Sequence, residues 1–253
     1  MTMTITVNAL KERIRRKELY VVAVIGLLLV ILFSSGAGTL TIGGEVVTGY
    51  HMLAPVMVVL INAISGALAI ALSINTIPNE YRRKTSHLIW IRGVKQWQYH
   101  ICLAIANVIS SLMAALMIYS GLFWVAIIKQ ETQEIFSLIP AFFIMATGIC
   151  MVSLFTSLLS IVLPGMAAGV IATACFLIGI FHGILDVVKN MAGGFTETII
   201  SVILKIIPDL NEIQSQAGNL IGGENVDAHV ILKGFFIIYI LTVFFFVFRK
   251  KEA

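Results

Sequence analysis

The chain has 253 residues, of which 59% are hydrophobic and 12% charged, and its formal net charge at pH 7 is +4. An average soluble domain carries roughly 25% charged residues, so this composition excludes a water-soluble fold and predicts one all-α membrane domain over residues 1–253. In a membrane protein the positions of the cations set the orientation, so the positive charge does not predict a nucleic-acid partner.

The first expected element is a short helix over 8–18 that lies along the cytoplasmic membrane surface. Asn8 is a candidate N-cap, and Leu10 and Ile14 lie four residues apart, so they share one apolar face. The cations that would face the lipid headgroups include Arg13, Arg16 and Lys17. The alternative is a charged tail that only fixes the orientation of the chain.

Six apolar runs are long enough to cross a membrane, since a spanning helix needs about 20 mostly apolar residues. They cover 19–40, 51–77, 101–128, 137–163, 166–188 and 230–248. An unclosed chain in lipid must be helical, because its backbone groups find no other partners there. For the first run a cleaved signal peptide is the alternative, because small residues at 35–37 follow its apolar stretch.

The basic residues indicate which side of the membrane each connection occupies. With six spans, 13 of the 17 Lys and Arg residues lie on the side of the two termini, within 11–17, 82–95 and 249–251. Positive charge marks the cytoplasmic side, so both termini are expected inside the cell.

The segment 78–100 is the longest expected cytoplasmic connection. It combines aliphatic and aromatic residues such as Leu88, Ile89 and Trp90 with several arginines and lysines. This mixture is typical of a short helix that docks onto another protein at the membrane surface. A solvated connection with interfacial aromatic residues explains the same composition.

Gly residues directly before and within the fifth run have the spacing that lets two helices approach closely. They are Gly165, Gly169, Gly179 and Gly183. This spacing suggests packing between two copies of the chain. His182 and Asp186 lie four residues apart near the outer end of the same run, where they could form a proton relay or an interfacial hydrogen bond.

The segment 189–229 is expected outside the cell. Within it, 196–207 carries isoleucines at helical spacing and is followed by Pro208, which ends the pattern. An apolar stretch of about 12 residues is too short to span, so we expect a re-entrant segment that dips into the outer leaflet or caps the bundle. A seventh span is the alternative, but it would place the basic C-terminus outside.

The sequence lacks the motifs of several enzyme classes. It contains no phosphate-binding loop of the form Gly-x-x-x-x-Gly-Lys-Ser/Thr, no His-Glu-x-x-His and no Gly-x-Ser-x-Gly. We therefore expect no catalytic residue, metal or cofactor in this chain. Ionisable groups are nearly absent from the six runs, which argues against an ion-coupled carrier. The three cysteines lie in apolar runs, where we expect them as small buried hydrophobes.

The layout of the chain resembles the ABC-2 family of transporter permeases, which have a surface helix, six spans, a coupling helix after the second span and an outer segment before the sixth. Locally, Glu80 followed by Thr85 and the aliphatic pair 88–89 is similar to the start of the family's coupling segment. The chain departs from the family pattern at Lys84, where glycine is usual, and at Arg92, where a proline often stands.

The resemblance implies a homodimer, or a pair with a sister permease, joined to two separate ATPase subunits that bind ATP and Mg. The residues that would couple those subunits to the spans are Glu80, Tyr81, Arg82, Arg83, Thr85, Leu88, Ile89, Trp90 and Arg92. An apolar path favours a hydrophobic or amphipathic cargo over a hydrated sugar or ion. The resemblance implies export across a bacterial plasma membrane, and it implies a peptide cargo because small bacterial members of the family often export peptides. The alternatives are a non-transporting sensor or immunity module and an ion-coupled secondary transporter.

Overall fold

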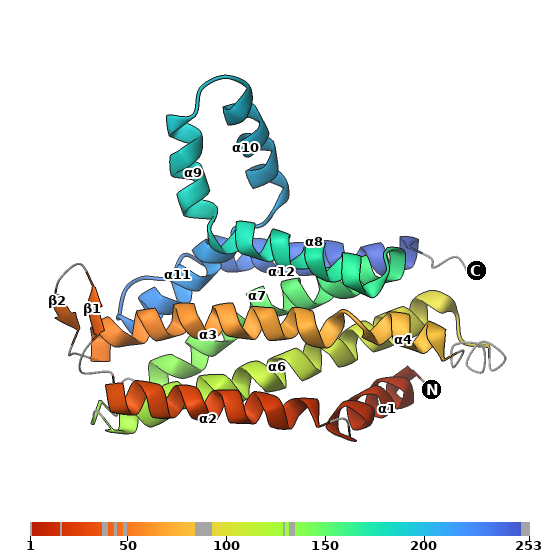
Figure 1. The fold of residues 1–253 in the computed structure, drawn as a ribbon, viewed down its shortest axis with the longest axis horizontal. Helices are drawn as coiled ribbons and strands as arrows, with labels where there is room; N and C mark the ends of the chain where they lie inside the picture. Colours follow the sequence, from red (N-terminus) through yellow and green to blue (C-terminus); the bar gives the residue numbers. More distant parts are fainter. Residues whose placement is uncertain are drawn as a thin grey trace.

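The apolar runs form helices that lie along the long axis of the molecule as a bundle (Figure 1). The computed structural model describes residues 2–15, 17–36, 40–42, 45–47, 50–83, 93–128, 130–131 and 135–248. The helices are α1 (Thr2–Arg15), α2 (Glu18–Gly36), α3 (Tyr50–Ser73), α4 (Thr76–Arg82), α6 (Gln96–Ile128), α7 (Ile135–Val162), α8 (Gly165–Ile180), α9 (His182–Met191), α10 (Phe195–Ile206), α11 (Leu210–Ile221) and α12 (Ala228–Val247).

Two short strands, β1 (Leu40–Ile42) and β2 (Glu45–Val47), pair antiparallel at one end of the bundle. We call this the hairpin end. The start of α1 and the end of α12 lie together at the opposite end, which we call the terminal end (Figure 1). The predicted helical class is confirmed, but this pair of short strands was not predicted.

Four described helical segments are long and apolar enough to cross a membrane, so the chain has the character of a multi-pass membrane protein. They are α3 with α4 over Ala54–Arg82, α6, α7 and α12. α8 and α9 together make a fifth candidate. α2 is a further apolar helix of 19 residues, packed on α6 within the predicted run 19–40. Six crossings and cytoplasmic termini stay predictions.

α1 is longer at its start than the predicted surface helix. It begins at Thr2 and ends at Arg15, whereas the prediction covers 8–18. Lys17 follows with a φ of 60°, a left-handed conformation that turns the chain into α2. Arg16 lies outside the described residues.

α1 buries a different face from the predicted one. Ile5 and Ala9, one turn apart, pack against the apolar cluster that α6 contributes to at the terminal end. Leu10 is half-buried, but Ile14 is 48% exposed. Leu10 and Ile14 are therefore not the residues through which α1 packs on this cluster, and their contact with the membrane surface stays a prediction.

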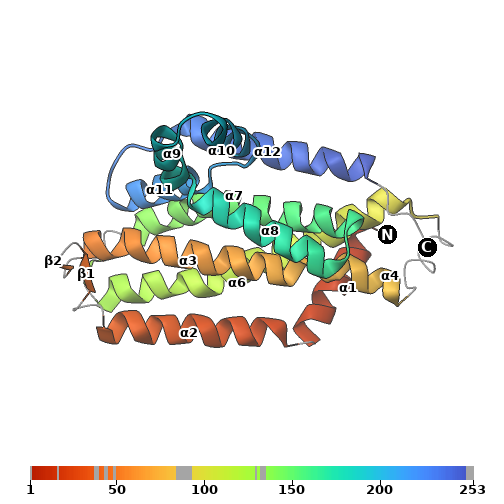
Figure 2. The same cartoon turned by 45° about the horizontal axis from the view of Figure 1, so that its top comes forward.

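α6 and α7 form the centre of the bundle, with α2 on one side and α12 on the other (Figure 2). Several hydroxyls on these two helices donate to the backbone carbonyl four residues earlier, which satisfies them without water. These hydroxyls belong to Ser110, Ser111, Thr156 and Ser157. Tyr119 of α6 donates across to the carbonyl oxygen of Leu138 on α7 over 2.9 Å.

The predicted fifth span, 166–188, is broken in the structure. α8 and α9 are bent by 72° at the break between them. α9 and α10 form a helical hairpin, the α9–α10 arm, which projects sideways from the bundle (Figures 1 and 2). Neither helix of the arm contains a buried residue. α10 confirms the apolar helix predicted over 196–207.

α11 was not predicted. It follows Pro208, turns back into the bundle and packs against α7 and α3. Its N-cap is Asp209, whose side chain accepts a hydrogen bond from the backbone N–H of Glu212 over 2.8 Å. The segment 189–229 thus contains the outer part of the arm, with the end of α9 and all of α10, and the helix α11 inside the bundle.

Candidate functional site

Polar contacts tie α4 to α6 at the terminal end of the bundle, and we call them the α4 clamp. The Tyr99 hydroxyl donates to Glu80 Oε2 over 2.8 Å. The Tyr81 hydroxyl lies 2.8 Å from His100 Nε2 and accepts from Gln96 Nε2 over 2.9 Å. Glu80 and Tyr81, both predicted coupling residues, are therefore held against the start of α6.

The end of α4 also contacts α1. Arg83 Nη1 lies 2.5 Å from Glu12 Oε1, and the two side chains are 53% and 37% exposed. Such exposed pairs contribute about 1 kcal/mol at most, so this contact orients α4 more than it stabilises it. Arg82 is exposed. The other predicted coupling residues lie outside the described residues, namely Thr85, Leu88, Ile89, Trp90 and Arg92.

Arg13 lies next to the α4 clamp and is buried, with 5% of its surface exposed. Its Nη2 donates to the Leu72 carbonyl oxygen and to Thr76 Oγ1, each over 2.6 Å, and to Asn107 Oδ1. Arg13 also lines a cavity of about 140 Å³ together with Glu12, Glu18 and Glu80. The prediction that Arg13 faces lipid headgroups is wrong, because protein acceptors replace water around it.

Amide and hydroxyl groups continue from Arg13 into the bundle. Asn107 Nδ2 donates to Ser157 Oγ over 2.7 Å, which links α6 to α7. The hydroxyls of Ser73 and Ser153 lie 3.0 Å apart, which links α3 to α7. In apolar surroundings such hydrogen bonds hold helices in one register, because lipid offers no partner to replace one that is lost.

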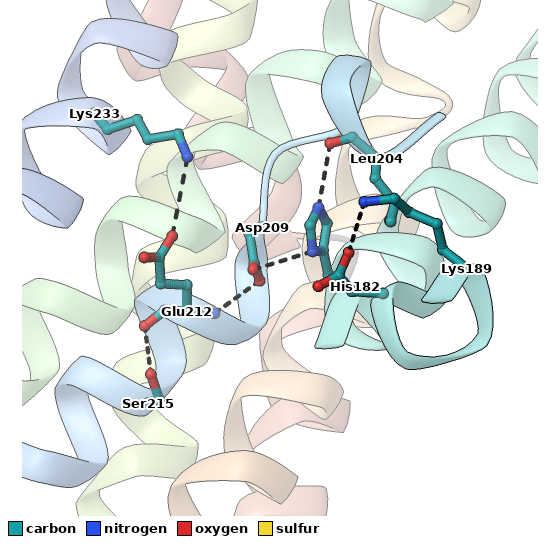
Figure 3. Close-up of polar contacts among 8 residues, drawn as sticks. His182, Lys189, Leu204, Asp209, Glu212, Ser215 and Lys233 are labelled. Atoms are coloured by element: carbon teal, nitrogen blue, oxygen red, sulfur yellow. Dashed lines mark hydrogen bonds and ion pairs between the residues drawn. The ribbon is translucent and has the colours of Figure 1, made fainter. Parts of the chain in front are cut away.

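A second polar group holds the break between α8 and α9 (Figure 3). His182 Nδ1 lies 3.2 Å from Asp209 Oδ2, and its Nε2 lies 3.2 Å from the Leu204 carbonyl oxygen. These contacts join the start of α9 to α10 and to the N-cap of α11. Asp186 instead pairs with Lys189 over 3.2 Å, so the relay or hydrogen bond considered for His182 and Asp186 does not form between them.

The glycines predicted to pack against a second copy have close neighbours within the chain. These glycines are Gly165, Gly169, Gly179 and Gly183. A Cβ atom on Gly169 would lie 2.0 Å from Ile74 Cδ1, and one on Gly179 would lie 3.0 Å from Leu210 Cγ. Their lack of a side chain therefore lets α8 approach the end of α3 and the start of α11. Packing between two copies stays a prediction.

The described residues contain no group of three His, Cys, Asp or Glu side chains placed to hold a metal ion. The three cysteines are free thiols, with Cys102 buried and Cys150 and Cys175 half-buried. Their surroundings agree with the apolar environment expected from the sequence.

Comparison of the chain with protein-family models, with curated proteins and with solved structures found no match. The resemblance to ABC-2 permeases therefore rests on the layout of the sequence and on the residues after the second apolar run. It stays a prediction.

Sequence reasoning missed the polar side chains that α11 brings into the bundle. Gln214 is 3% exposed, and its Oε1 accepts from Asn62 Nδ2 of α3 over 3.0 Å. A signal for this helix was present, since Asp209 followed three residues later by Glu212 matches an N-terminal capping pattern directly after Pro208. The polar composition that follows resembled a loop.

Proposed function

We propose that this chain is the membrane-spanning permease subunit of an ATP-driven exporter. It crosses a bacterial plasma membrane six times, with both termini in the cytoplasm and the α9–α10 arm on the outer side. It acts as a homodimer or with a sister permease, and two separate ATPase subunits bind ATP and Mg. The cargo is hydrophobic or amphipathic, and a peptide fits best.

The α4 clamp is the observation that carries this proposal. Residues 83–95 connect α4 to α6, and the clamp joins the two helices on either side of that connection through Glu80 and Tyr99 and through Tyr81 and His100. A partner that moves the connection therefore moves the end of α4 and the start of α6 as one unit.

The two clamped helices would transmit this motion into the bundle, because both are continuous with or packed against other spans. α4 prolongs α3 in one candidate span, Ala54–Arg82, and α6 packs against α2, α3 and α7. ATP binding biases a membrane domain only through contacts that differ between its two states, and a docked connection tied to two spans supplies such contacts.

The test is the ATP turnover of the chain reconstituted with the ATPase subunit encoded beside it, measured relative to the isolated ATPase. Glu80→Lys places a cation where the Tyr99 hydroxyl now donates, so it should break the clamp and return turnover to that of the isolated ATPase. Membrane insertion should be unchanged. Glu197→Lys makes the same charge change on the exposed face of α10 and should leave turnover unaltered.

Two results would count against the proposal. Full turnover in the complex carrying Glu80→Lys rejects the coupling role of the clamp. If the chain purifies from its native membrane in mild detergent without any nucleotide-binding subunit, and no adjacent gene encodes one, the exporter function itself is rejected.

A further inference from the structure

A cleft of about 440 Å³ lies between α3 and α11. Pro55 and Val59 form its α3 wall, and Asn211, Gln214 and Ser215 lie on its α11 wall. Pro55 is one to two turns from the start of α3, so the cleft lies at the hairpin end of the bundle, away from the α4 clamp.

The polar α11 wall is joined to α3 by a hydrogen bond that lies deeper in the bundle. Behind it, Gln214 is 3% exposed and is fixed by the hydrogen bond from Asn62. Asn62 lies 12 residues after the start of α3, which is about 18 Å along the helix axis at 1.5 Å per residue. The hydrocarbon layer is roughly 30 Å thick, so amide groups extend to the middle of the layer that α3 would cross.

These groups cannot face lipid without a cost. Asn211 is exposed on α11, and an amide side chain in hydrocarbon needs hydrogen-bond partners, whereas the exposed Ser215 hydroxyl already donates to the Glu212 carbonyl oxygen over 2.8 Å. The cleft must therefore hold water, a ligand or another protein surface. Amide and hydroxyl side chains both donate and accept hydrogen bonds, as the peptide backbone does, so the wall is matched to a polypeptide.

The remaining chemistry of the cleft narrows the class of ligand. None of the described residues that line it is aromatic or positively charged, and Glu224 supplies a carboxylate. A sugar site usually offers aromatic faces, and a site for an anion offers cations. Pro55 and Val59 provide an apolar strip opposite the amides. This combination fits an extended peptide that is neutral or cationic and carries apolar side chains.

We propose that this cleft binds the exported peptide through its backbone amides. The inference rests on the proposed function and adds to it the position of a peptide site on the release side, with Asn211, Gln214, Ser215 and Asn219 as hydrogen-bonding residues. Because these side chains would form hydrogen bonds with the peptide backbone, a synthetic peptide that is neutral or cationic and carries apolar side chains should bind without being the natural cargo.

The experiment uses the full chain with its three cysteines replaced by alanine and with Ser215→Cys as the single thiol. In proteoliposomes, a charged methanethiosulfonate reagent should label this thiol, because the cleft is open to water. The probe is a 16-residue peptide of leucine, lysine and alanine with blocked ends. At ten times its Kd it should slow labelling about ten-fold. Asn190→Cys, on the exposed face of α9, is the matched control and should show no slowing.

A second measurement tests the amides themselves. Asn211→Leu and Asn219→Leu should each weaken peptide binding about two- to ten-fold, the effect of one lost hydrogen bond. Asn190→Leu on the arm should leave binding unchanged. All variants must elute from gel filtration as the parent chain does, which separates loss of binding from loss of folding.

Three results would overturn the peptide site. If the thiol of the Ser215→Cys variant stays unreactive, the cleft is closed or faces lipid, and if that thiol forms disulfide-linked dimers, a second copy covers the cleft. Dodecyltrimethylammonium has a charge and an apolar chain but no amides. If it protects the thiol from labelling as well as the peptide does, the α11 wall does not recognise peptide groups. These assays need no ATPase, so a chain that stimulates ATP turnover but fails them keeps its proposed function and loses only this site.

Discussion

Replacing Arg13 should destabilise the bundle far more than replacing its neighbour on α1. Arg13 donates to acceptors on α3, α4 and α6, so one side chain joins α1 to three other helices. In Arg13→Ala, the Leu72 carbonyl keeps a hydrogen bond from the Thr76 hydroxyl over 3.1 Å, but Thr76 Oγ1 and Asn107 Oδ1 lose a charged donor.

The size of the effect follows from these two lost contacts. Hydrogen bonds to a charged group contribute about 1.5–3 kcal/mol each, so Arg13→Ala should lower the free energy of unfolding by about 3–6 kcal/mol. Arg15 lies two residues away and is exposed, so Arg15→Ala should change it by about 0.5 kcal/mol at most.

The measurement is SDS-induced unfolding in mixed micelles, followed by far-ultraviolet circular dichroism. Arg13→Lys is an informative third variant, because all three contacts come from the single nitrogen Nη2, and an ammonium group on a shorter side chain tests whether a lysine can reach the same acceptors. If Arg13→Ala and Arg15→Ala unfold within about 1 kcal/mol of each other, the buried contacts of Arg13 do not stabilise the fold and the reasoning is refuted.

Two further substitutions test helix packing by the same unfolding assay. A Cβ atom on Gly66 would lie 2.1 Å from the Phe176 ring, so Gly66→Ala should push α3 away from α8 and cost about 1–3 kcal/mol; an unchanged stability would show that the ring moves aside freely. Tyr119→Phe removes the buried hydrogen bond to Leu138 and should cost about 1 kcal/mol, whereas Tyr239→Phe, at a 66% exposed residue, should cost nothing measurable; equal effects would contradict the contact.

The long helices could be predicted because the bilayer imposes a simple requirement on sequence. A run of about 20 apolar residues has few stable alternatives to a spanning helix, and the runs 101–128 and 137–163 match α6 and α7 closely. Their ends differ by a few residues, since Gln96 and Ile135 begin the helices before the apolar runs start. The added residues of α6, 96–100, are polar or aromatic, so hydropathy gives little signal there, whereas α7 is extended by the apolar pair Ile135 and Phe136.

The break after α8 could not be predicted in the same way. Both sides of it are apolar, and no proline marks the bend within 166–188. The contacts that hold it come from Leu204 and Asp209, more than 20 positions beyond His182. Hydropathy reports how well each residue suits lipid, but it carries no information about such distant partners.

The candidate site shows the same division between local and distant information. The sequence identified Glu80 and Tyr81 as part of a connection suited to docking, but their partners Tyr99 and His100 lie 19 positions further on. Nothing in the composition specifies that pairing. Arg13 was assigned to the membrane surface because cations usually are, and only the acceptors gathered from three helices explain its burial.

The α9–α10 arm determines which part of the molecule unfolds first. α9 has 10 residues and α10 has 12, and isolated helices shorter than about 12–15 residues are marginal in water. Neither buries a side chain in the bundle, so the arm can unfold while α6 and α7 stay intact. Amide hydrogens of the arm should therefore exchange with deuterium well before those of the central helices, which makes the chain two cooperative units of unequal stability.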